Sequence, residues 1–198
     1  TKGYLEKLIA QVFTGRERFE PGNPQEGYSP SPQERQSWLQ ISYMKEAYHT
    51  MGPKFTLGWM AEALYSSKNF SENYTATMMQ AGEFAPTPHS KLMYNEAFRA
   101  NQYVAAGIKP IYVLNDMFQF RTEFYGFTPI FPIKKNALNK AYYGKAFSRF
   151  EYMGEVSVIC HLPFGAISAY VNHYSSPRRE WNVGMTIGWQ LFNYRFVE

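Results

Sequence analysis

Residues Trp181 to Phe196 read W-N-V-G-M-T-I-G-W-Q-L-F-N-Y-R-F, and this stretch decides the fold. Every second residue from Trp181 to Leu191 is apolar, whereas the residues between them are small or polar. Successive side chains of a β-strand point to opposite faces, so the pattern predicts a strand with one apolar and one polar face. A tilted bilayer-crossing strand needs about 9–11 residues, and aromatic residues collect at both membrane interfaces. The stretch therefore predicts a transmembrane strand whose apolar face, with Ile187, contacts lipid.

Two other interpretations of this stretch stay open while it is read alone. A soluble β-sandwich strand alternates in the same way, with its apolar face toward a protein core. The spacing of Gly184 and Gly188 also resembles a helix-dimerisation motif, which requires an apolar segment of about 20 residues. Asn182, Gln190 and Asn193 interrupt such a segment. The rest of the chain has to decide between a membrane and a soluble β-structure.

The composition fits strands that face lipid on one side and water on the other. The 198 residues are 45% hydrophobic and 18% aromatic, yet the mean hydropathy is −0.42. No apolar run reaches the roughly 18 residues of a membrane helix. The net charge is +4 and the basic residues are scattered, so no nucleic-acid partner is expected. Cys160, the one cysteine, is expected to be a small apolar residue on a strand face.

Eight candidate strands share this alternation. The clearest after the last one is Phe55–Tyr65, which carries Trp59 on its apolar face, and Phe118 and Phe120 lie together on the apolar face of a later strand. We expect these three side chains to contact lipid. Tyr4–Phe13 fits a helical stripe as well as a strand, and its neighbours favour the strand. The eight candidates are residues 4–13, 37–49, 55–65, 101–114, 117–127, 150–162, 166–174 and 181–196.

The connections between these strands alternate in length. The long ones are residues 14–36, 67–100 and 128–143, and the short ones are residues 50–53, 115–116 and 163–165. Bacterial outer-membrane barrels have short periplasmic turns and longer extracellular loops. The chain is therefore expected to be all-β, an antiparallel transmembrane β-barrel in a bacterial outer membrane, with its C-terminus on the periplasmic side.

Three parts of the chain resemble one group of outer-membrane barrels. Leu162–Tyr174 and Val183–Phe192 resemble the end of the surface-antigen barrels related to BamA-type assembly factors. More narrowly, they resemble the C-terminal barrel that follows a patatin-like phospholipase domain in outer-membrane proteins of Bacteroidota. Asn95–Tyr103 lies where that superfamily carries its V-R-G-F/Y motif, and Arg99 matches the motif whereas its neighbours do not. Arg121–Pro129 resembles the strand that follows.

The resemblance implies the C-terminal half of a barrel of about sixteen strands. Residues 1–198 would form one barrel domain, and further strands and any upstream domain would belong to a longer protein. An open half-barrel would leave unpaired strand edges in lipid, which is energetically costly. An eight-stranded barrel that closes by itself is the alternative. The first residues, T-K-G-Y-L-E-K-L-I-A, have no secretory signal, which favours the longer protein.

The resemblance also implies a structural role for Arg99. In the family, the loop that carries this arginine folds into the lumen, where the arginine meets an acidic residue on an inner strand face. Glu123 and Glu62 both lie on polar faces of candidate strands. We expect Arg99 to pair with Glu123, with Glu62 as the second choice, because arginine and carboxylate form charge-assisted bonds. The alternative is an Arg99 solvated at the loop surface.

No catalytic, cofactor or metal site is expected in this chain. The lipase nucleophile elbow G-x-S-x-G does not occur in the sequence, so any acyl hydrolase activity on lipids would belong to an upstream domain. The histidines lack metal-ligand spacing and are expected in loops, interfaces or the lumen. They are His49, His89, His161 and His173.

The last strand resembles the signal that barrel-insertion machinery reads, carried here by Trp189, Leu191, Phe192 and Phe196. Deleting Trp189–Glu198 should abolish insertion. Expected partners are outer-membrane lipid, the insertion machinery and other outer-membrane proteins. The resemblance thus implies the anchor or translocation barrel of a patatin-like phospholipase-type protein. The barrel of an assembly or translocation factor, or an autonomous small barrel anchor, are the alternatives.

Overall fold

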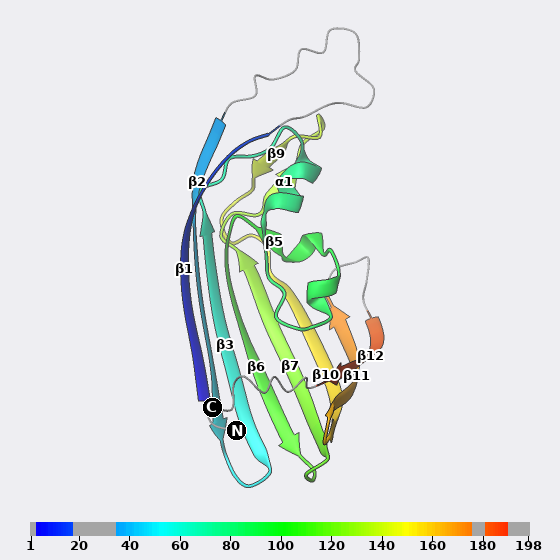
Figure 1. Cartoon of the computed structure of the whole chain (residues 1–198). Helices are drawn as coiled ribbons and strands as arrows, with labels where there is room; N and C mark the ends of the chain where they lie inside the picture. Colours follow the sequence, from blue (N-terminus) through cyan, green and yellow to red (C-terminus); the bar gives the residue numbers. More distant parts are fainter. Residues whose placement is uncertain (1–2, 18–34, 176–180, 190–198) are drawn as a thin grey trace.

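The computed structural model describes residues 3–17, 35–175 and 181–189, and one antiparallel sheet of eight strands dominates it (Figure 1). The strands are neighbours in chain order, β1-β2-β3-β6-β7-β10-β11-β12. Their bounds are β1 Gly3–Arg16, β2 Arg35–Thr50, β3 Phe55–Ser66, β6 Gln102–Val113, β7 Phe118–Pro129, β10 Glu151–Leu162, β11 Gly165–Tyr174 and β12 Trp181–Trp189. The prediction of eight antiparallel strands is confirmed, including β1, whose periodicity also fitted a helix.

The long strands separate an apolar face from a polar one. Directly opposite residues of an antiparallel pair share a face, so the cross-strand register assigns each side chain to one side of the sheet. The outer face, turned away from helix α1 (Tyr74–Gln80), carries Trp59, Phe118, Phe120 and Ile187. Phe118, Phe120 and Ile187 are 38%, 42% and 54% exposed, and no described residue forms a second layer over them.

The outer face is free of formal charge over most of its width. From β3 to β12, its described strand residues include no Asp, Glu, Lys or Arg. The exception is at β1 and β2, where Lys45 Nζ lies 3.5 Å from Glu6 Oε2 and the Tyr43 hydroxyl donates to the same carboxylate at 2.8 Å. A wide exposed apolar surface of this kind is unusual on a soluble monomeric protein.

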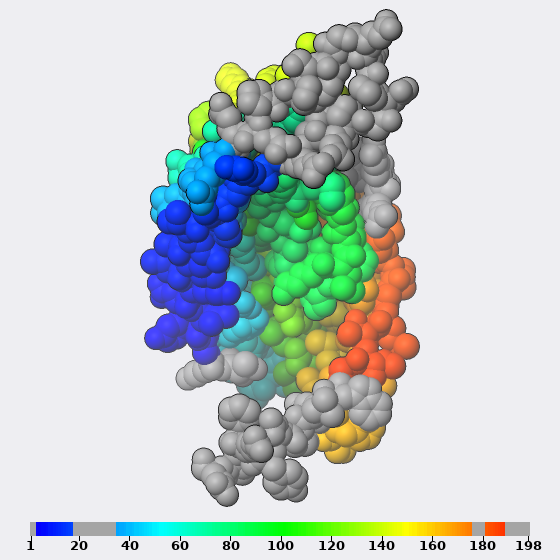
Figure 2. Space-filling view, turned by 45° about the horizontal axis from the view of Figure 1, so that its top comes forward, coloured from blue at the N-terminus to red at the C-terminus, as the bar shows by residue number. Residues whose placement is uncertain are grey.

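Within the described residues the sheet is open and does not close into a barrel by itself. Among the described residues, β1 and β12 each pair with one neighbour only. The sheet curves so that these two edge strands stand on opposite sides of a hollow (Figure 2). In the described part of the chain, no helix has the length and apolar content of a membrane span.

The short and the long connections lie at opposite ends of the sheet. The short connections 51–54, 114–117 and 163–164 lie at one end, at the bottom of Figure 1. The long connections 67–101 and 130–150 lie at the other end. The predicted separation of short and long connections is thus confirmed for the described residues.

The two long connections are more ordered than irregular loops, which the sequence did not indicate. Residues 67–101, here called the inserted segment, contain α1, the strands β4 (Gly82–Glu83) and β5 (Arg99–Ala100), and the 3-10 helices η1 (Ser90–Leu92) and η2 (Glu96–Phe98). Asn73 caps α1 by accepting a 2.8 Å bond from the Ala76 backbone N–H. The other connection holds the hairpin β8 (Ile133–Lys135) and β9 (Ala141–Tyr143).

Tyrosine rings lie flat on glycines along the inner face. Tyr125 is the direct cross-strand partner of Gly107, and Tyr48 is that of Gly58. A Cβ at either glycine would collide with the partner ring. Glycine therefore supplies the space in which each ring lies along the wall, so that its hydroxyl reaches neighbouring acidic groups.

Candidate functional site: the filled interior of the curved sheet

The inserted segment packs against the inner face and fills part of the hollow (Figures 1 and 2). Phe84 and Phe98 of this segment are each 1% exposed and meet Phe127 of β7, with ring centroids 5.9 and 5.6 Å apart. The Tyr103 ring of β6 lies 5.0 Å from the same Phe127 ring. These rings exclude water where they meet, and the burial of aromatic side chains anchors the segment to the sheet.

Arg99 holds the inserted segment together. Its Nη1 donates to the carbonyl oxygens of Met78, Met79 and Ala81, at 3.4, 3.0 and 3.3 Å, and its Nη2 pairs with the Glu83 carboxylate. These carbonyls belong to the last turn of α1 and its C-terminal cap, where helical carbonyls lack partners and a cation is favourable. The side chain is 12% exposed, so Arg99 is not solvated at a loop surface.

The predicted pairing of Arg99 with Glu123 or Glu62 is wrong. Arg99 and Glu83 are register partners in the two-stranded sheet β4–β5, so the nearest carboxylate comes from the inserted segment itself. Burial raises the pKa of Glu83, and the attraction of Arg99 only partly offsets that rise. The segment lies against the inner face, but the bonds of Arg99 stay within the segment and do not attach it to the wall.

Glu62 and Glu123 lie on the inner face, as predicted, but each has a tyrosine partner. The Tyr103 hydroxyl donates to Glu62 Oε1 at 2.5 Å and lies 3.2 Å from the Glu83 carbonyl oxygen, so Tyr103 ties β3 to the inserted segment. Glu123 pairs with Arg121 and accepts a 2.6 Å bond from the Tyr125 hydroxyl. Because Glu123 is only 2% exposed and already paired, it has no free oxygen for a distant arginine.

A band of charged and amide side chains crosses the inner face from Glu46 on β2 to Asn172 on β11. Lys109 Nζ lies 2.6 Å from Glu46 Oε1, and the Tyr48 hydroxyl donates to the same carboxylate. On β10 and β11, Asn172 Nδ2 donates to Glu155 Oε2 at 3.5 Å. We call this set the inner polar band. It comprises Glu46, Tyr48, Lys109, Arg121, Glu123, Glu155 and Asn172.

The inner polar band makes the two halves of the hollow chemically different. Aromatic side chains pack near the long connections, whereas the ion pairs Lys109–Glu46 and Arg121–Glu123 lie nearer the short turns. Buried charges are tolerated when they are paired or hydrogen-bonded. Lys109 pairs with Glu46 and Arg121 with Glu123, whereas Glu155, the cross-strand partner of Glu123, is bonded by the Asn172 amide. This arrangement suits a wall that faces water or another polar surface.

The histidines and the cysteine have ordinary surroundings. Trp59 Nε1 lies 3.4 Å from His49 Nε2, His89 Nδ1 lies 3.0 Å from the Tyr174 hydroxyl, and His161 Nε2 lies 3.3 Å from Gln119 Oε1. The His173 ring packs on Trp181 at 4.7 Å between centroids. Within the described residues, no three His, Cys, Asp or Glu side chains gather as metal ligands, and Cys160 is a free thiol.

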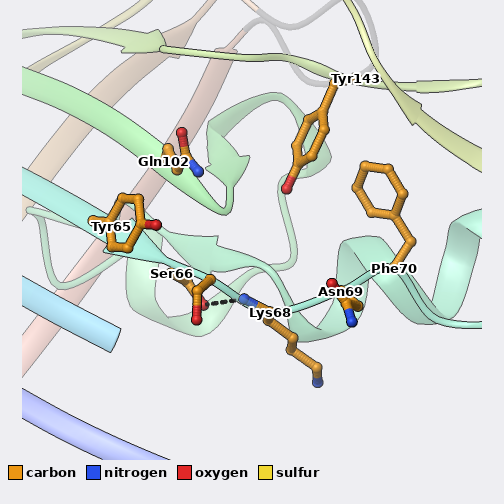
Figure 3. A pocket seen from close by; sticks show the side chains of 8 residues that line it. Tyr65, Ser66, Lys68, Asn69, Phe70, Gln102 and Tyr143 are labelled. Carbon is orange, nitrogen blue, oxygen red and sulfur yellow. Dashed lines mark hydrogen bonds between the residues drawn. The ribbon is translucent and has the colours of Figure 1, made fainter. Parts of the chain in front are cut away.

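Two cavities adjoin at Lys68, at the end of the sheet that carries the long connections. The larger has a volume of about 440 Å³ and lies between the end of β3, the start of β6 and the β8–β9 hairpin (Figure 3). The smaller, of about 240 Å³, is lined by Arg16, Trp38 and Gln80. Burial lowers the pKa of Lys68, whose ammonium donates to Gln80 and lies 4.5 Å from the Trp38 ring centroid.

The last strand is described as far as Trp189. Leu191, Phe192 and Phe196 of the expected insertion signal lie outside the described residues. Comparison of the chain with protein-family models, with curated proteins and with solved structures yields no match.

Proposed function

We propose that this chain is part of an outer-membrane β-barrel that serves as the anchor or translocation domain of a patatin-like phospholipase-type protein. The observation that carries the membrane assignment is the outer face. Among the described strand residues from β3 to β12, this face is mostly apolar and carries no formal charge, while the inner face of the same strands is charged and hydrogen-bonded. Strands of outer-membrane barrels alternate in this way between lipid and lumen.

The open edges and the inserted segment support a barrel larger than eight strands. An eight-stranded barrel has an interior just wide enough for its own side chains. Here the inner face also accommodates α1 and two 3-10 helices, which need more room than side chains alone. Further strands pairing with β1 and β12 would close such a barrel and remove both edges from lipid. The autonomous small barrel is therefore the weakest of the three candidates.

The inserted segment favours an anchor or a gated translocation domain over a passive pore. Phe84, Phe98 and Phe127 leave no water-filled path where they meet, since each is at most 1% exposed. Transport through this half would require the segment to move. The barrel of an assembly or translocation factor shares this requirement and is the second candidate. Its protein partners would bind at the charged Glu6–Lys45 patch of the outer face.

A nitroxide scan of the complete natural protein in lipid vesicles tests the membrane assignment. Labels would be placed at Phe120 and Ile187 on the outer face, and at their neighbours Gln119 and Thr186 on the inner face, in a Cys160→Ser background. The outer labels should be relaxed by oxygen dissolved in lipid, and the inner labels by a water-soluble nickel chelate. Outer labels that respond mainly to the nickel chelate would refute the proposal.

The choice between the two larger barrels depends on the coding sequence upstream of Thr1. A G-x-S-x-G motif after a strand would support the phospholipase fusion, because that motif places a nucleophilic serine on a tight strand-to-helix turn. Periplasmic repeat domains without this motif would support an assembly factor. A secretory signal directly before Thr1 would revive the small barrel.

A further inference from the structure

The cavity of about 440 Å³ is here called the rim cavity, and it lies apart from the outer face and the aromatic contacts that support the proposed function. Tyr65 and Gln102, direct register partners on β3 and β6, form one side of it, and Phe70 and Tyr143 stand opposite (Figure 3). The Phe70 and Tyr143 rings are in contact, with centroids 4.4 Å apart and planes inclined by 50°. The cavity thus combines an aromatic wall with polar edges, a composition typical of small-molecule sites.

The polar groups of the rim cavity have hydrogen-bonding capacity to spare. The side-chain amides of Asn69 and Gln102 and the hydroxyl of Tyr65 bond to no described residue. Tyr143 accepts a 3.1 Å bond from Asn101 Nδ2, which leaves its own hydroxyl proton to donate. Together, two amides and two hydroxyls offer both donors and acceptors around one space.

The rim cavity lacks a free cation or carboxylate. Lys68 is its one charged lining residue, and its side chain points away from Tyr65 and Gln102 (Figure 3). Its ammonium is already held by Gln80 and the Trp38 ring. A phosphate or carboxylate ligand would therefore find no counter-charge, which favours a neutral ligand rich in hydroxyl groups.

We propose that the rim cavity binds a neutral saccharide. A sugar ring presents C–H groups on its face, which pack on aromatic rings, and hydroxyls on its edge, which both donate and accept hydrogen bonds. Phe70 and Tyr143 supply the ring surface, and Asn69, Gln102 and Tyr65 supply the edge contacts. The volume is within the range of about 300–1,000 Å³ for ligand sites and admits one or two sugar rings.

The source of the sugar rests on the proposed function, whereas the binding itself does not. If the long connections are extracellular, the rim cavity opens beside the outer leaflet, where a glycolipid headgroup or a free oligosaccharide could enter. Both present the same hydroxyl-rich ring. Saccharide binding by the purified protein therefore tests the rim cavity alone, and the nitroxide scan tests the membrane assignment alone. Either result can be negative while the other is positive.

The test uses the complete natural protein in detergent micelles on an array of neutral mono- to tetrasaccharides, with phosphorylated and sulfated sugars alongside. Hits are then titrated calorimetrically as free oligosaccharides and as glycolipid vesicles with the same headgroup. We expect at least one neutral sugar to bind. Binding of the free sugar indicates a soluble source, and binding of the vesicles alone indicates a glycolipid. Binding of none of the neutral sugars, or of charged sugars only, overturns the proposal.

Substitutions of residues that line the rim cavity test whether a bound sugar occupies it. Gln102→Ala and Tyr143→Ala should each raise the Kd about tenfold, which is the effect of losing one ordinary hydrogen bond or ring contact. Tyr143→Phe keeps the ring and should lose less, which guards against a folding defect in the alanine variant. Tyr142→Ala is the control, because Tyr142 is exposed in the same β9 strand and does not line the cavity. Unchanged binding in Gln102→Ala and Tyr143→Ala would refute the assignment.

Discussion

Arg99 and Glu83 lie opposite each other in the two-stranded sheet β4–β5, and their ion pair closes the inserted segment on itself. The same guanidinium caps the carbonyls at the end of α1, so one side chain joins the helix to the strand pair. The aromatic contacts of Phe84 and Phe98 then hold this closed unit against the inner face. Arg99 therefore stabilises the segment internally, and the phenylalanines attach it to the wall.

Arg99→Ala should loosen α1 without unfolding the large sheet. The change removes three carbonyl bonds and an ion pair of a side chain that is 12% exposed, a loss of about 2 kcal/mol for the local structure. Arg99→Lys should lose less local stability, because the ammonium keeps the positive charge. Some loss should remain, because lysine lacks the planar fork of donors. The measurement is the mobility of a nitroxide at the exposed Thr75 of α1, in a Cys160→Ser background.

The matched control is Arg35→Ala, which removes an exposed arginine whose bond goes to Thr14 Oγ1 at 3.0 Å. It should leave the mobility of the Thr75 label unchanged. Equal mobility in Arg99→Ala and in the wild-type protein would show that Arg99 does not hold the helix.

Glu83 should make docking of the inserted segment pH-dependent. Burial raises the pKa of Glu83 above its ordinary value of 4.5, despite the opposing effect of Arg99. The docked segment therefore binds a proton more tightly than the undocked one, and the contribution of Glu83 is greatest below the ordinary pKa. It declines as the pH rises through the raised pKa. The Thr75 label should accordingly be more mobile at neutral than at mildly acidic pH.

Glu83→Gln removes this titration and keeps an oxygen for Arg99. In that variant, the mobility of the Thr75 label should vary less with pH than in the wild-type protein, and docking at neutral pH should be at least as tight. An unchanged pH dependence would assign the effect to other groups and contradict the role given to Glu83.

The sheet could be predicted from the sequence because a strand imposes a period of two on its side chains. Even β1, whose leucines also fit a helix, was assigned correctly from its neighbours. The connections alternate in length along the sequence, and antiparallel strands in chain order place alternate connections at opposite ends of the sheet. Whether the sheet closes could not be predicted, because closure depends on which strands pair with β1 and β12, and local periodicity does not contain that information.

The partner of Arg99 could not be found from periodicity, because the inserted segment has no simple period. Pro86 and Pro88 indicated a loop, and α1 is only seven residues long. One signal was nevertheless present. Arg121 and Glu123 are two residues apart in a strand, and residues at this spacing share a face, so Glu123 already had a cation beside it.

Gly107 should tolerate no side chain. A Cβ there would collide with the Tyr125 ring and lie 2.7 Å from the Phe124 carbonyl oxygen, and a backbone atom cannot move aside cheaply. We expect Gly107→Ala to cost about 2 kcal/mol in the free energy of unfolding, measured by urea titration of tryptophan fluorescence in micelles. Gly188→Ala is the control, because its Cβ would meet only the Ala166 oxygen at 3.9 Å. Equal stability of the two variants would contradict the close tyrosine packing.

Lys109 and Glu46 should be strongly coupled, because both are largely buried and 2.6 Å apart. Lys109→Met alone leaves the Glu46 carboxylate without its cation and should cost about 3 kcal/mol of unfolding free energy. Lys109→Met combined with Glu46→Gln should cost less than the sum of the single changes, with a coupling of about 1–3 kcal/mol in a double-mutant cycle. The corresponding cycle for Lys140 and Glu72, 3.8 Å apart with Lys140 60% exposed, should give a coupling below about 1 kcal/mol. Similar couplings in the two cycles would mean that bulk water screens the inner polar band, and that its charges contribute no more than those of an exposed pair.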